Sequence, residues 1–294
     1  MTSPCFICQG TVFEHRTPPY RRCRACGHET LLDHATQTYM LNDALIAEDA
    51  PRRSFLDRFQ DAVLRRGRQG TEGGQWVDIG SGSGRLLARN RGEFARQCGV
   101  EITPAAVEFS REVLGLNIVN DISQVAGGIN LATAWHSLEH FPTPALESLL
   151  ANLSARMPPG GRFIVSVPNG DSYQYRLFRE QYAFFDVPNH LQQFTPDSLG
   201  RLLAAHGFTA AAPVISWPYN IFGYAQALLN VVLRDHNYLY YRLKRRTVAA
   251  SPWRDLANLC LLPVVLPAAL GLSLLDAARP DRQAVLTCSF TKHG

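Results

Sequence analysis

A glycine-rich turn, Gly80-Ser81-Gly82-Ser83-Gly84, lies between two segments of different pattern. Residues 75–79 form a short apolar run that predicts a buried strand, and residues 85–91 begin a helical pattern. Because glycine has no Cβ, the backbone of such a turn can adopt left-handed dihedrals and approach a ligand closely. A strand, a glycine turn and a helix in this order predict a ligand-binding loop at the edge of an α/β sheet.

Strand and helix patterns keep alternating after this turn. Further strands are expected at 98–102, 117–119, 129–135, 161–167, 208–216 and 284–290. Helices are expected at 52–66, 85–91, 104–114, 144–156 and 196–206, the last capped by Thr195 and ended by Gly207. This alternation predicts an α/β fold with a doubly wound, mostly parallel, seven-stranded sheet. Ligands of such sheets bind at the carboxyl ends of the strands, near the switch point in strand order.

Acidic residues occur where three of these strands end. Asp78 lies two residues before the first glycine of the turn, where its carboxylate could order the loop by accepting from backbone amides. Glu101 ends the second strand, a position from which a carboxylate can accept both hydroxyls of a ribose. Asp121 follows the third strand, near where an adenine ring would lie. A glycine turn alone is weak evidence, but these acids favour a nucleotide-type cofactor.

Four cysteines form two CxxC pairs near the N-terminus: Cys5 with Cys8, and Cys23 with Cys26. Two such pairs supply the four soft ligands of a tetrahedral Zn²⁺, and a site with four thiolates leaves no open position for catalysis. We therefore expect a structural zinc in a module of residues 1–35 that is too small to bury a core of its own. Disulfides or a redox-active pair are the alternatives. His15, His28 and His34 are nearby residues that could replace a cysteine.

The remaining composition sets only broad limits. No signal peptide precedes the first cysteine pair, and Cys98, Cys260 and Cys288 are scattered in apolar surroundings, so buried thiols in a reducing cytoplasm are expected. The formal net charge of +4 is too small to indicate nucleic acid by itself. Arg16, Arg21, Arg22 and Arg24 around the second cysteine pair leave RNA as an alternative partner.

Five segments, in this order along the chain, carry a resemblance to a known family. They are VDIGSGSGRLL (77–87), GVEITPAAVEFSRE (99–112), WHSLEHFPTP (135–144), MPPGGRFIVSVPN (157–169) and NHLQQFTPDSLGRLLAAHGF (189–208). As a set they resemble the class I S-adenosylmethionine-dependent methyltransferases, over about residues 75–216 and a last strand at 284–290. The chain is most similar to the branch with the ubiquinone-biosynthesis O-methyltransferases and sugar methyltransferases. Several members of that branch carry an N-terminal four-cysteine zinc knuckle.

The resemblance implies roles for individual residues in binding S-adenosylmethionine. The implied cofactor-binding residues are Asp78, Gly80, Gly82, Gly84, Glu101, Ile102, Asp121, Ile122 and Trp135. In this assignment the glycines line the methionine and ribose, Glu101 holds the ribose hydroxyls, and Ile102, Asp121 and Ile122 surround the adenine. Trp135 and His136 would border the methionine end. The chain departs from the family at Ile129-Asn130, where Phe-Asp is usual, and we expect that change to affect loop packing more than cofactor binding.

Methyl transfer is an in-line displacement, so the protein aligns the acceptor and, where needed, removes its proton. A histidine is the natural base near neutral pH, and His190 and His136 are the catalytic candidates. His190 falls in a loop that forms the substrate lid in this family, whereas His136 follows the fourth strand. His140 is expected to be structural. Tyr173, Tyr175 and Tyr182 could line a substrate pocket or pack beneath the loop.

A hydrophobic helical insertion is predicted at 217–280, where the plain fold needs only a turn. Residues 217–233 are strongly apolar, residues 242–246 form a basic run, and Leu256–Leu275 has no charged residue. Three interpretations remain: a hairpin in the cytoplasmic leaflet, a subunit interface or lid, and a pair of spanning helices. Peripheral association with the inner face of the membrane is preferred, because both ends of the insertion must return to the sheet. Pro263 and Pro267 would break or kink a helix there.

The predicted organisation is therefore a zinc module at 1–35, a helical linker at 36–74, a methyltransferase domain at 75–216 plus 281–294, and the insertion. The expected function is methyl transfer to a small-molecule, sugar or lipid-linked acceptor in the cytoplasm. An RNA methyltransferase is the alternative, although no Asn-Pro-Pro-Tyr-type tetrapeptide follows the fourth strand. A scaffold that binds cofactor without catalysis is the second alternative. The sequence does not predict the acceptor atom or the oligomeric state.

Overall fold

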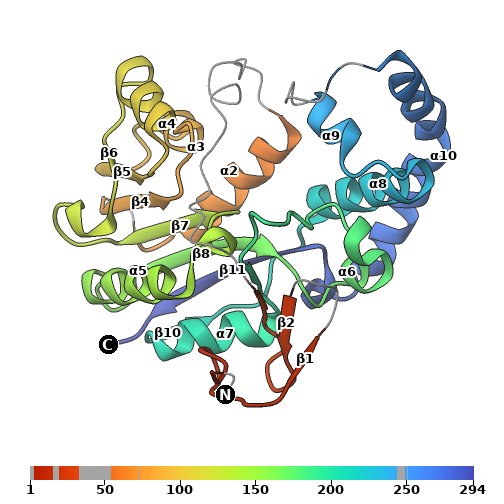
Figure 1. Cartoon of the computed structure of the whole chain (residues 1–294). Helices are drawn as coiled ribbons and strands as arrows, with labels where there is room; N and C mark the ends of the chain where they lie inside the picture. The colour runs from red at the N-terminus through yellow and green to blue at the C-terminus, as the bar shows by residue number, and fades with distance from the viewer. Residues whose placement is uncertain (1–2, 16–19, 33–53, 72, 244–248, 250) are drawn as a thin grey trace.

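The computed structural model describes residues 3–15, 20–32, 54–71, 73–243, 249 and 251–294 (Figure 1). A twisted sheet crosses the centre of the molecule, and helices cover both of its faces. The red N-terminal segment lies below the sheet in this view, and the blue helices of the insertion project to the right. Parts of the predicted organisation fall outside the described residues. They are the 35/36 boundary, residues 36–53 and 72 of the linker, His34, Arg16, the first two residues of the 52–66 helix and residues 244–246 of the basic run.

The central sheet has seven strands in the order β10-β11-β8-β7-β4-β5-β6. The strands are β4 (Gln75–Ile79), β5 (Arg96–Val100), β6 (Ile118–Val119), β7 (Leu131–Trp135), β8 (Arg162–Pro168), β10 (Phe208–Ala210) and β11 (Val285–Lys292). All pairs from β6 to β8 are parallel, and β11 is antiparallel to both β8 and β10. The expected doubly wound, mostly parallel, seven-stranded sheet is confirmed. Strand order reverses between β4 and β7, so a ligand is expected at their carboxyl ends.

One strand is much shorter than the sequence pattern predicts. The expected strand at 208–216 ends at Ala210, although the backbone amides of Ala211 and Val214 still donate to Ser289 and Thr287 of β11. Pro213 interrupts the ladder because proline has no amide hydrogen to donate. The second strand is displaced as well: β5 starts at Arg96 and ends at Val100, so Glu101 is the first residue after it.

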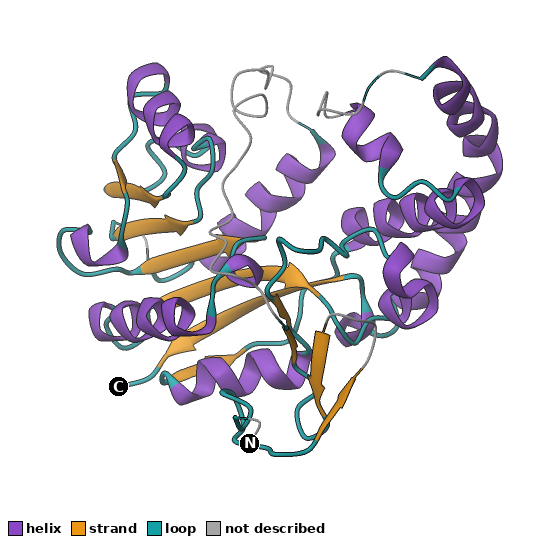
Figure 2. Ribbon diagram, in the orientation of Figure 1, coloured by secondary structure: helices purple, strands orange, loops and turns teal. Residues whose placement is uncertain are grey.

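Helices pack on both faces of the sheet and make a three-layer structure (Figure 2). One face is covered by α5 (Thr143–Arg156) and α7 (Pro196–Ala205). The other is covered by α2 (Phe55–Gly67), α3 (Arg85–Arg89) and α4 (Pro104–Glu108), which continues as the π-helical turn η1 (Phe109–Val113). Thr195 caps α7 as predicted, since its hydroxyl accepts from the Ser198 amide. The two faces hold separate apolar cores on either side of the same strands.

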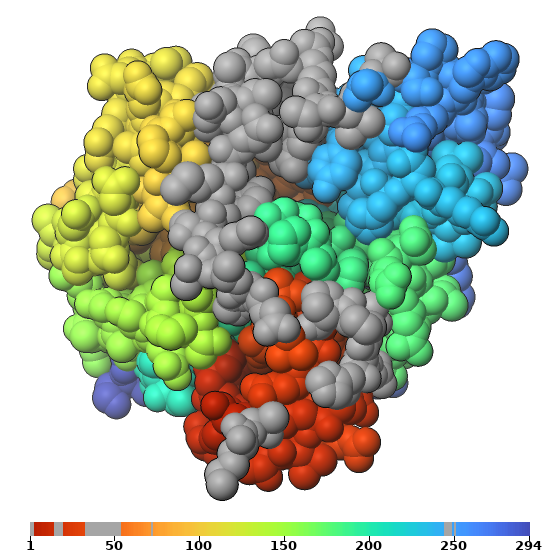
Figure 3. Space-filling model, in the orientation of Figure 1, coloured from red at the N-terminus to blue at the C-terminus, as the bar shows by residue number. Residues whose placement is uncertain are grey.

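A second sheet joins the N-terminal module to the domain of the central sheet. Strands β1 (Phe13–His15), β2 (Tyr20–Cys23) and β3 (Glu29–Leu31) form an antiparallel sheet, and β9 (Gln192–Gln193) adds to its edge. Side chains reinforce this pairing: His28 Nε2 lies 2.8 Å from Gln192 Oε1, and Thr195 Oγ1 donates to the carbonyl of Cys26 at 2.8 Å. Figure 3 shows the red module directly against the green segment that leads to β9. The module is therefore built into the loop between β8 and α7.

A buried ion pair lies at this junction. The Glu29 carboxylate is fully buried and accepts from Arg22 Nη1 at 2.8 Å and from the Tyr175 hydroxyl at 2.5 Å. Arg22 is also 3.6 Å from Asp171 Oδ1, across the module boundary. The partners satisfy both carboxylate oxygens, which is the condition under which a buried charge can be accommodated. Tyr175 belongs to α6 (Tyr173–Phe178), so the contact fixes the module against the segment after β8.

The expected insertion is helical. It contains α8 (Trp217–Leu233), α9 (Tyr238–Leu243) and α10 (Pro252–Asp276), followed by the short turn η5 (Pro280–Arg282). A break or a kink was expected at Pro263 and Pro267; both lie inside α10, so the helix is not broken there. Helix α10 packs along α8, where Tyr224 and Asn220 donate to the buried carboxylate of Asp276 at 3.0 and 3.1 Å. The predicted burial of Cys260 is wrong, because this thiol lies on the exposed side of α10.

Removing the buried carboxylate should loosen the module. We expect Glu29→Ala to lower the free energy of unfolding by about 3–5 kcal/mol, since it leaves Arg22 and Tyr175 buried without their acceptor. The matched control is Glu14→Ala, which removes a more exposed partner of Arg22 and should cost no more than about 1 kcal/mol. Chemical denaturation of both metal-loaded variants measures the difference. Equal losses in the two variants would contradict the role of Glu29.

Candidate functional site

The glycine turn forms the wall of a site at the carboxyl end of β4. Gly80, Gly82 and Gly84 all have positive φ, at 68°, 54° and 71°. A Cβ on Gly80 would lie 2.5 Å from Cβ of Ser137, and one on Gly84 would lie 2.5 Å from a methyl group of Leu116. Glycine is therefore required here by dihedral and by contact. The close approach of Ser137 to Gly80 also shows that the turn packs directly on the segment after β7.

Backbone amides of the turn are held by the end of β5. The amides of Gly80 and Ser81 donate to the carbonyl of Val100 at 2.8 and 3.1 Å, and the Gly82 amide donates to Glu101 Oε2 at 2.8 Å. The other carboxylate oxygen of Glu101 accepts from the amides of Ile102 and Thr103. Glu101 therefore links the glycine turn to the start of α4, and its carboxylate faces the same strand ends.

Asp78 orders the site differently from the sequence expectation. Its Oδ1 accepts from Thr133 Oγ1 of β7 at 2.5 Å, and Thr133 in turn accepts from the indole nitrogen of Trp76 at 2.9 Å. No hydrogen bond from a loop amide to Asp78 occurs among the described residues, so the expected contact is wrong. Burial raises the pKa of Asp78 to about 7, and the Thr133 hydroxyl opposes that rise. The carboxyl group couples β4 to β7 beneath the turn.

The remaining predicted cofactor residues lie along the neighbouring strand ends. Ile102 is exposed after β5, and Asp121 is exposed after β6, where its Oδ1 accepts from the Ser123 amide at 2.7 Å. Hydrogen bonding from the side chain of Ser123, and then from its amide, lowers the pKa of Asp121. Ile122, by contrast, is buried in the core beneath them. Asn130 lies at the opposite end of β7, where its Oδ1 accepts from the Gln75 amide at 3.0 Å, in keeping with a packing role.

Several buried polar atoms at these strand ends have no hydrogen-bond partner among the described residues. They are Ser81 Oγ, Trp135 Nε1, His136 Nε2 and both oxygens of Glu139. Buried polar groups are nearly always satisfied in native proteins, so such a cluster indicates a place where a ligand supplies the missing partners. The atoms belong to the ends of β4 and β7, on either side of the switch point. The described residues therefore fit a polar cofactor lying across the glycine turn.

His136 and Glu139 form a pair directly after β7. His136 adopts a φ of 49°, which is unusual for a residue other than glycine, and its Nδ1 lies 3.5 Å from Glu139 Oε1. Its ring stacks on Phe184 and lies 5.0 Å from the ring of Tyr219 in α8. The side chain of His136 is 26% exposed and that of Glu139 is 0% exposed. Burial opposes ionisation of Glu139, but the neighbouring His136, His140 and His190 lower its pKa overall.

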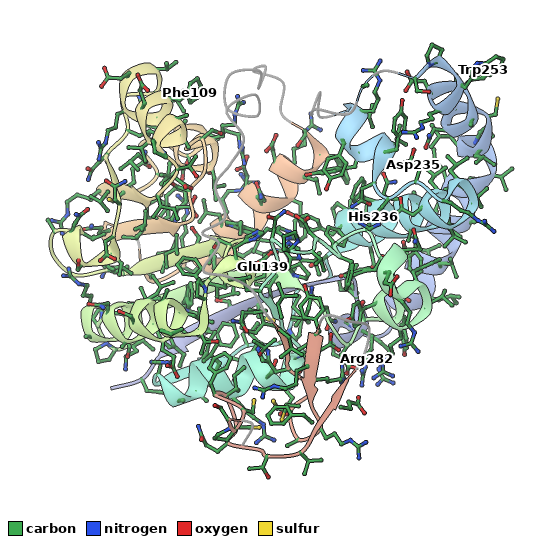
Figure 4. The ribbon with its side chains drawn as sticks, in the orientation of Figure 1. Phe109, Glu139, Asp235, His236, Trp253 and Arg282 are labelled. Carbon is green, nitrogen blue, oxygen red and sulfur yellow. The ribbon has the colours of Figure 1, made fainter. Side chains whose placement is uncertain are left out.

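His190 also lies close to Glu139 and is itself buried. Its ring is 4.8 Å from that of His140, and its backbone carbonyl accepts from the hydroxyl of Tyr20 in β2 at 2.6 Å. Burial lowers the pKa of His190 to about 4. Figure 4 places Glu139 near the centre of the molecule, at the ends of the central strands. The structure thus brings His136 and His190, the two histidines predicted to act in catalysis, to the same carboxylate.

The three tyrosines of the following loop divide between surface and core. Tyr173 is exposed, whereas Tyr175 and Tyr182 are buried, and the Tyr182 hydroxyl donates to the carbonyl of Ala284. Burial raises the pKa of Tyr182 and Tyr175 above the usual range. Two roles were open for these tyrosines, lining a substrate pocket or packing beneath the loop. Tyr175 and Tyr182 pack beneath the loop.

The four cysteines of the N-terminal module lie together. Cys5 Sγ is 3.8 Å from Cys26 Sγ, and Cys8 Sγ is 3.5 Å from Cys23 Sγ; all four are free thiols rather than disulfides. Sulfurs bound at about 2.3 Å to a tetrahedral Zn²⁺ would be roughly 3.8 Å apart. Gly27 has a φ of 71° in the second knuckle, as its place in the motif predicts. His28 is buried beside the cluster, where its Nε2 pairs with Gln192.

Sequence reasoning underestimated Glu139, Thr133 and Tyr219. Glu139 was visible as the acid of the segment His136-Ser137-Leu138-Glu139-His140, where three ionisable residues fall within five positions. Nothing local indicates that Thr133 receives the Asp78 carboxyl or that Tyr219, from the insertion, reaches His136. Both contacts join residues more than fifty positions apart, so only the folded chain reveals them.

A family model described as a methyltransferase domain matches residues 50–212. None of the curated proteins matches the chain. Among solved structures, a proposed sarcosine dimethylglycine methyltransferase from Galdieria sulphuraria is 11% identical, with a TM-score of 0.50 over 81% of this chain and 85% of that chain. At this identity the likeness concerns the fold alone.

Two further structures are similar at a lower score. An S-adenosylmethionine-dependent methyltransferase from Clostridium acetobutylicum has 11% identity and a TM-score of 0.48, covering 86% of this chain and 96% of that chain. Phosphoethanolamine N-methyltransferase 2 from Haemonchus contortus, solved with S-adenosyl-L-methionine, has 13% identity and a TM-score of 0.49 over 81% of this chain and 53% of its own.

The family match covers more than half of the chain and includes the glycine turn, Glu101 and the segment after β7. The seven-stranded sheet has the order β10-β11-β8-β7-β4-β5-β6, with β11 antiparallel to its neighbour β8. The chain belongs to the methyltransferase-domain family, among the class I S-adenosylmethionine-dependent methyltransferases.

Proposed function

We propose that this protein transfers a methyl group from S-adenosylmethionine to a small-molecule, sugar or lipid-linked acceptor. The observation that carries the proposal is the cluster of unpartnered polar atoms between the glycine turn and the segment after β7, on a sheet of this family. Glu101 would hold the ribose hydroxyls, and the exposed Ile102 and Asp121 would surround the adenine. The glycine amides and Trp135 would border the methionine part.

When bound, the cofactor supplies an electrophilic methyl group. The chain's part is to align the acceptor in line with it and to accept the acceptor's proton. His136 is the better placed base, because it is partly exposed at the end of β7 and its Nδ1 lies 3.5 Å from Glu139 Oε1, which can orient the ring. His190 remains the second candidate, although its side chain is buried between Glu139 and His140.

Cofactor binding can be measured without knowing the acceptor. We expect S-adenosylhomocysteine to bind the wild type and to bind Glu101→Gln at least about tenfold more weakly, since the variant loses a charged acceptor for the ribose hydroxyls. Glu93→Gln changes an exposed glutamate away from the strand ends and is the control. Isothermal calorimetry gives the affinities. Absent binding by the wild type, or equal affinity in Glu101→Gln, would reject the assignment.

We further propose that Cys5, Cys8, Cys23 and Cys26 hold a structural Zn²⁺. The four sulfurs lie close enough together to bind one ion. A site with four thiolate ligands leaves no open position for catalysis, which supports a structural role. The ion would stiffen β1–β3 and, through the pairing of β3 with β9, the segment that carries His190. The module would therefore act on the site by positioning, without touching the reacting atoms.

Loss of the zinc should increase amide hydrogen exchange in β9, which belongs to the methyltransferase domain. We expect Cys23→Ser to lose its bound zinc and to speed amide exchange at Gln192 and Gln193, because their partner strand β3 would no longer be held. Cys260→Ser, which changes an exposed cysteine on α10, should keep the metal and the exchange rates. Elemental analysis and hydrogen exchange test both points. Unchanged exchange at β9 in the zinc-free variant would oppose the bracing role.

The insertion supports a third proposal, that this protein associates with the surface of a bilayer. Among the described helices, α10 alone is long and apolar enough to span a membrane, and only 22% of its most apolar window is buried. Its exposed apolar side chains are Leu256, Leu259, Val264, Leu266, Leu270, Leu274 and Leu275. Such a face on a helix whose other side packs on α8 suits insertion into one leaflet better than spanning.

Residues at the start of α10 suit the boundary between lipid and water. Trp253 is 81% exposed at the outer tip of the insertion, as Figure 4 shows, and Arg254 follows it. Arg242, at the end of α9, is close to the same end and pairs with Asp255 at 3.3 Å. Tryptophan and arginine together are enriched where a helix meets the headgroups. An acceptor carried by a lipid would then be presented from the same side.

Charge on the exposed face of α10 should abolish this association. We expect the double variant Leu259→Glu and Val264→Glu to lose flotation with anionic liposomes, whereas the wild type floats. Val113→Glu is the matched control, since Val113 is equally exposed but lies at the end of η1, in another layer of the molecule. Equal flotation of the double variant and the control, or none by the wild type, would reject the proposal.

The arginines that suggested RNA are largely engaged within the protein. Arg22 pairs with Glu29 and Asp171, Arg24 with Glu14 at 3.6 Å, and Arg21 lies over the ring of Phe13 at 4.1 Å. Paired arginines release few counterions on binding phosphates, so they add little to affinity for a nucleic acid. The small-molecule or lipid-linked acceptor is therefore the function that we favour over RNA.

A further inference from the structure

A second group of potential metal ligands lies at the centre of the site, apart from the cysteines. Glu139, His140 and His190 each offer one ligand atom, and these atoms lie within 4.8 Å of one another. Glu139 and His140 belong to the short helical turn η3 (Leu138–His140) after β7, and His190 comes from the loop before β9. The three side chains converge from two segments about fifty residues apart.

Two side chains of this group, Glu139 and His190, have buried polar atoms without a hydrogen-bond partner among the described residues. Glu139 is 0% exposed, and neither of its oxygens accepts a hydrogen bond from a described residue. His190 is 7% exposed, and its Nδ1 also lacks a partner within the described chain. His136 Nδ1 lies 3.5 Å from one oxygen of Glu139, but a buried carboxylate that accepts no hydrogen bond is still strongly disfavoured in the interior. A bound cation would remove this penalty by accepting lone pairs from all three groups.

The surrounding backbone holds the three side chains in place. The Leu191 amide donates to the carbonyl of Glu139 at 2.8 Å, and the hydroxyl of Tyr20 donates to the carbonyl of His190 at 2.6 Å. His140 Nδ1 lies 2.9 Å from the carbonyl of Asn189, an oxygen that can only accept, so this nitrogen carries the proton. That arrangement leaves Nε2 of His140 as the ligand nitrogen, and metal-bound histidines commonly show a backbone carbonyl on the other nitrogen.

We propose that Glu139, His140 and His190 bind a divalent transition-metal cation beside the glycine turn. Two imidazoles and one carboxylate suit Zn²⁺, Mn²⁺, Fe²⁺ or Co²⁺, whereas Mg²⁺ and Ca²⁺ prefer sites built from oxygen. His136 Nδ1 lies 3.5 Å from Glu139 Oε1, so one carboxylate oxygen can stay with His136 while the other faces the cation. Three protein ligands leave at least one coordination position open, unlike the four-cysteine site.

This site deepens the proposed function and rests on it in one respect. Ser137, between His136 and Leu138, contacts Gly80, so the cation would lie next to the turn that holds the methyl donor. An acceptor hydroxyl bound at the open position would lose its proton more readily, because a cation lowers the pKa of a bound oxygen. His136 would take that proton; the oxygen would form a bond to the methyl carbon, and the carbon–sulfur bond would break with its electron pair on sulfur. The predicted acceptor is therefore an oxygen nucleophile.

Metal binding can be tested independently of activity. The full chain, with zinc in the four-cysteine site, is titrated with Mn²⁺ while the signal of free Mn²⁺ is followed by electron paramagnetic resonance. Mn²⁺ competes poorly for thiolates, so it reports on the second site. We expect the wild type to remove Mn²⁺ from solution, and both Glu139→Gln and His190→Gln to bind it more than about tenfold more weakly.

The controls separate this inference from the two proposals on which it could depend. His293→Gln changes an exposed histidine at the C-terminal end and should bind Mn²⁺ like the wild type. Zinc content and S-adenosylhomocysteine affinity, measured on every variant, show whether each variant keeps its fold, its four-cysteine metal and its cofactor site. A wild type that binds the cofactor but no Mn²⁺ would overturn the metal site alone. Mn²⁺ binding that survives both substitutions in folded variants would also overturn it.

Discussion

The pairing of β3 with β9 is the interaction on which the candidate site depends. It joins a module of about thirty N-terminal residues to the loop between β8 and α7, and the fully buried Glu29, held by Arg22 and Tyr175, lies at the join. The same loop supplies His190 and, through the Leu191 amide, fixes the backbone of Glu139. The pairing adds to contacts that the loop already makes with the segment after β7, where Gln192 Nε2 donates to the carbonyl of Phe141 at 3.2 Å. The N-terminal module is thus part of the architecture of the site.

Four parts of the chain meet around Glu139. The glycine turn contacts Ser137, the end of β7 supplies His136, the loop braced by the module supplies His190, and Tyr219 of α8 packs on His136. By this convergence, the insertion and the N-terminal module would influence the proposed reaction without contributing atoms to it. If α10 lies in a leaflet, α8 links the membrane surface to the site through Tyr219. The proposed membrane association, zinc site and methyl transfer are therefore connected by packing.

The sequence predicted the parts whose signals are local. The seven-stranded sheet, the left-handed glycines, the Thr195 cap and the helical insertion follow from periodicity, turn chemistry and capping, and the structure contains all of them. The cysteine spacing indicated four neighbouring sulfurs, which the structure brings together. The site residues proposed for cofactor and catalysis stay predictions until a ligand is bound.

The features that the sequence did not reveal depend on distant residues. The addition of β9 to the module joins residues more than 160 positions apart, and a two-residue strand leaves no periodic signal. The Asp78 carboxylate accepts from Thr133 of the adjacent strand, a partner 55 positions away that no local pattern indicates. Pro213 cut the sixth strand short, and Cys260 fell on the exposed side of α10 because only one face of that helix packs on α8.

A crystal structure with S-adenosylhomocysteine tests the central claim most directly, since it locates the cofactor and the reacting centre together. We expect the ribose hydroxyls on the Glu101 carboxylate and the sulfur beside Gly80, facing His136 and Glu139. A cofactor bound elsewhere, or one whose sulfur points away from Glu139, would contradict it.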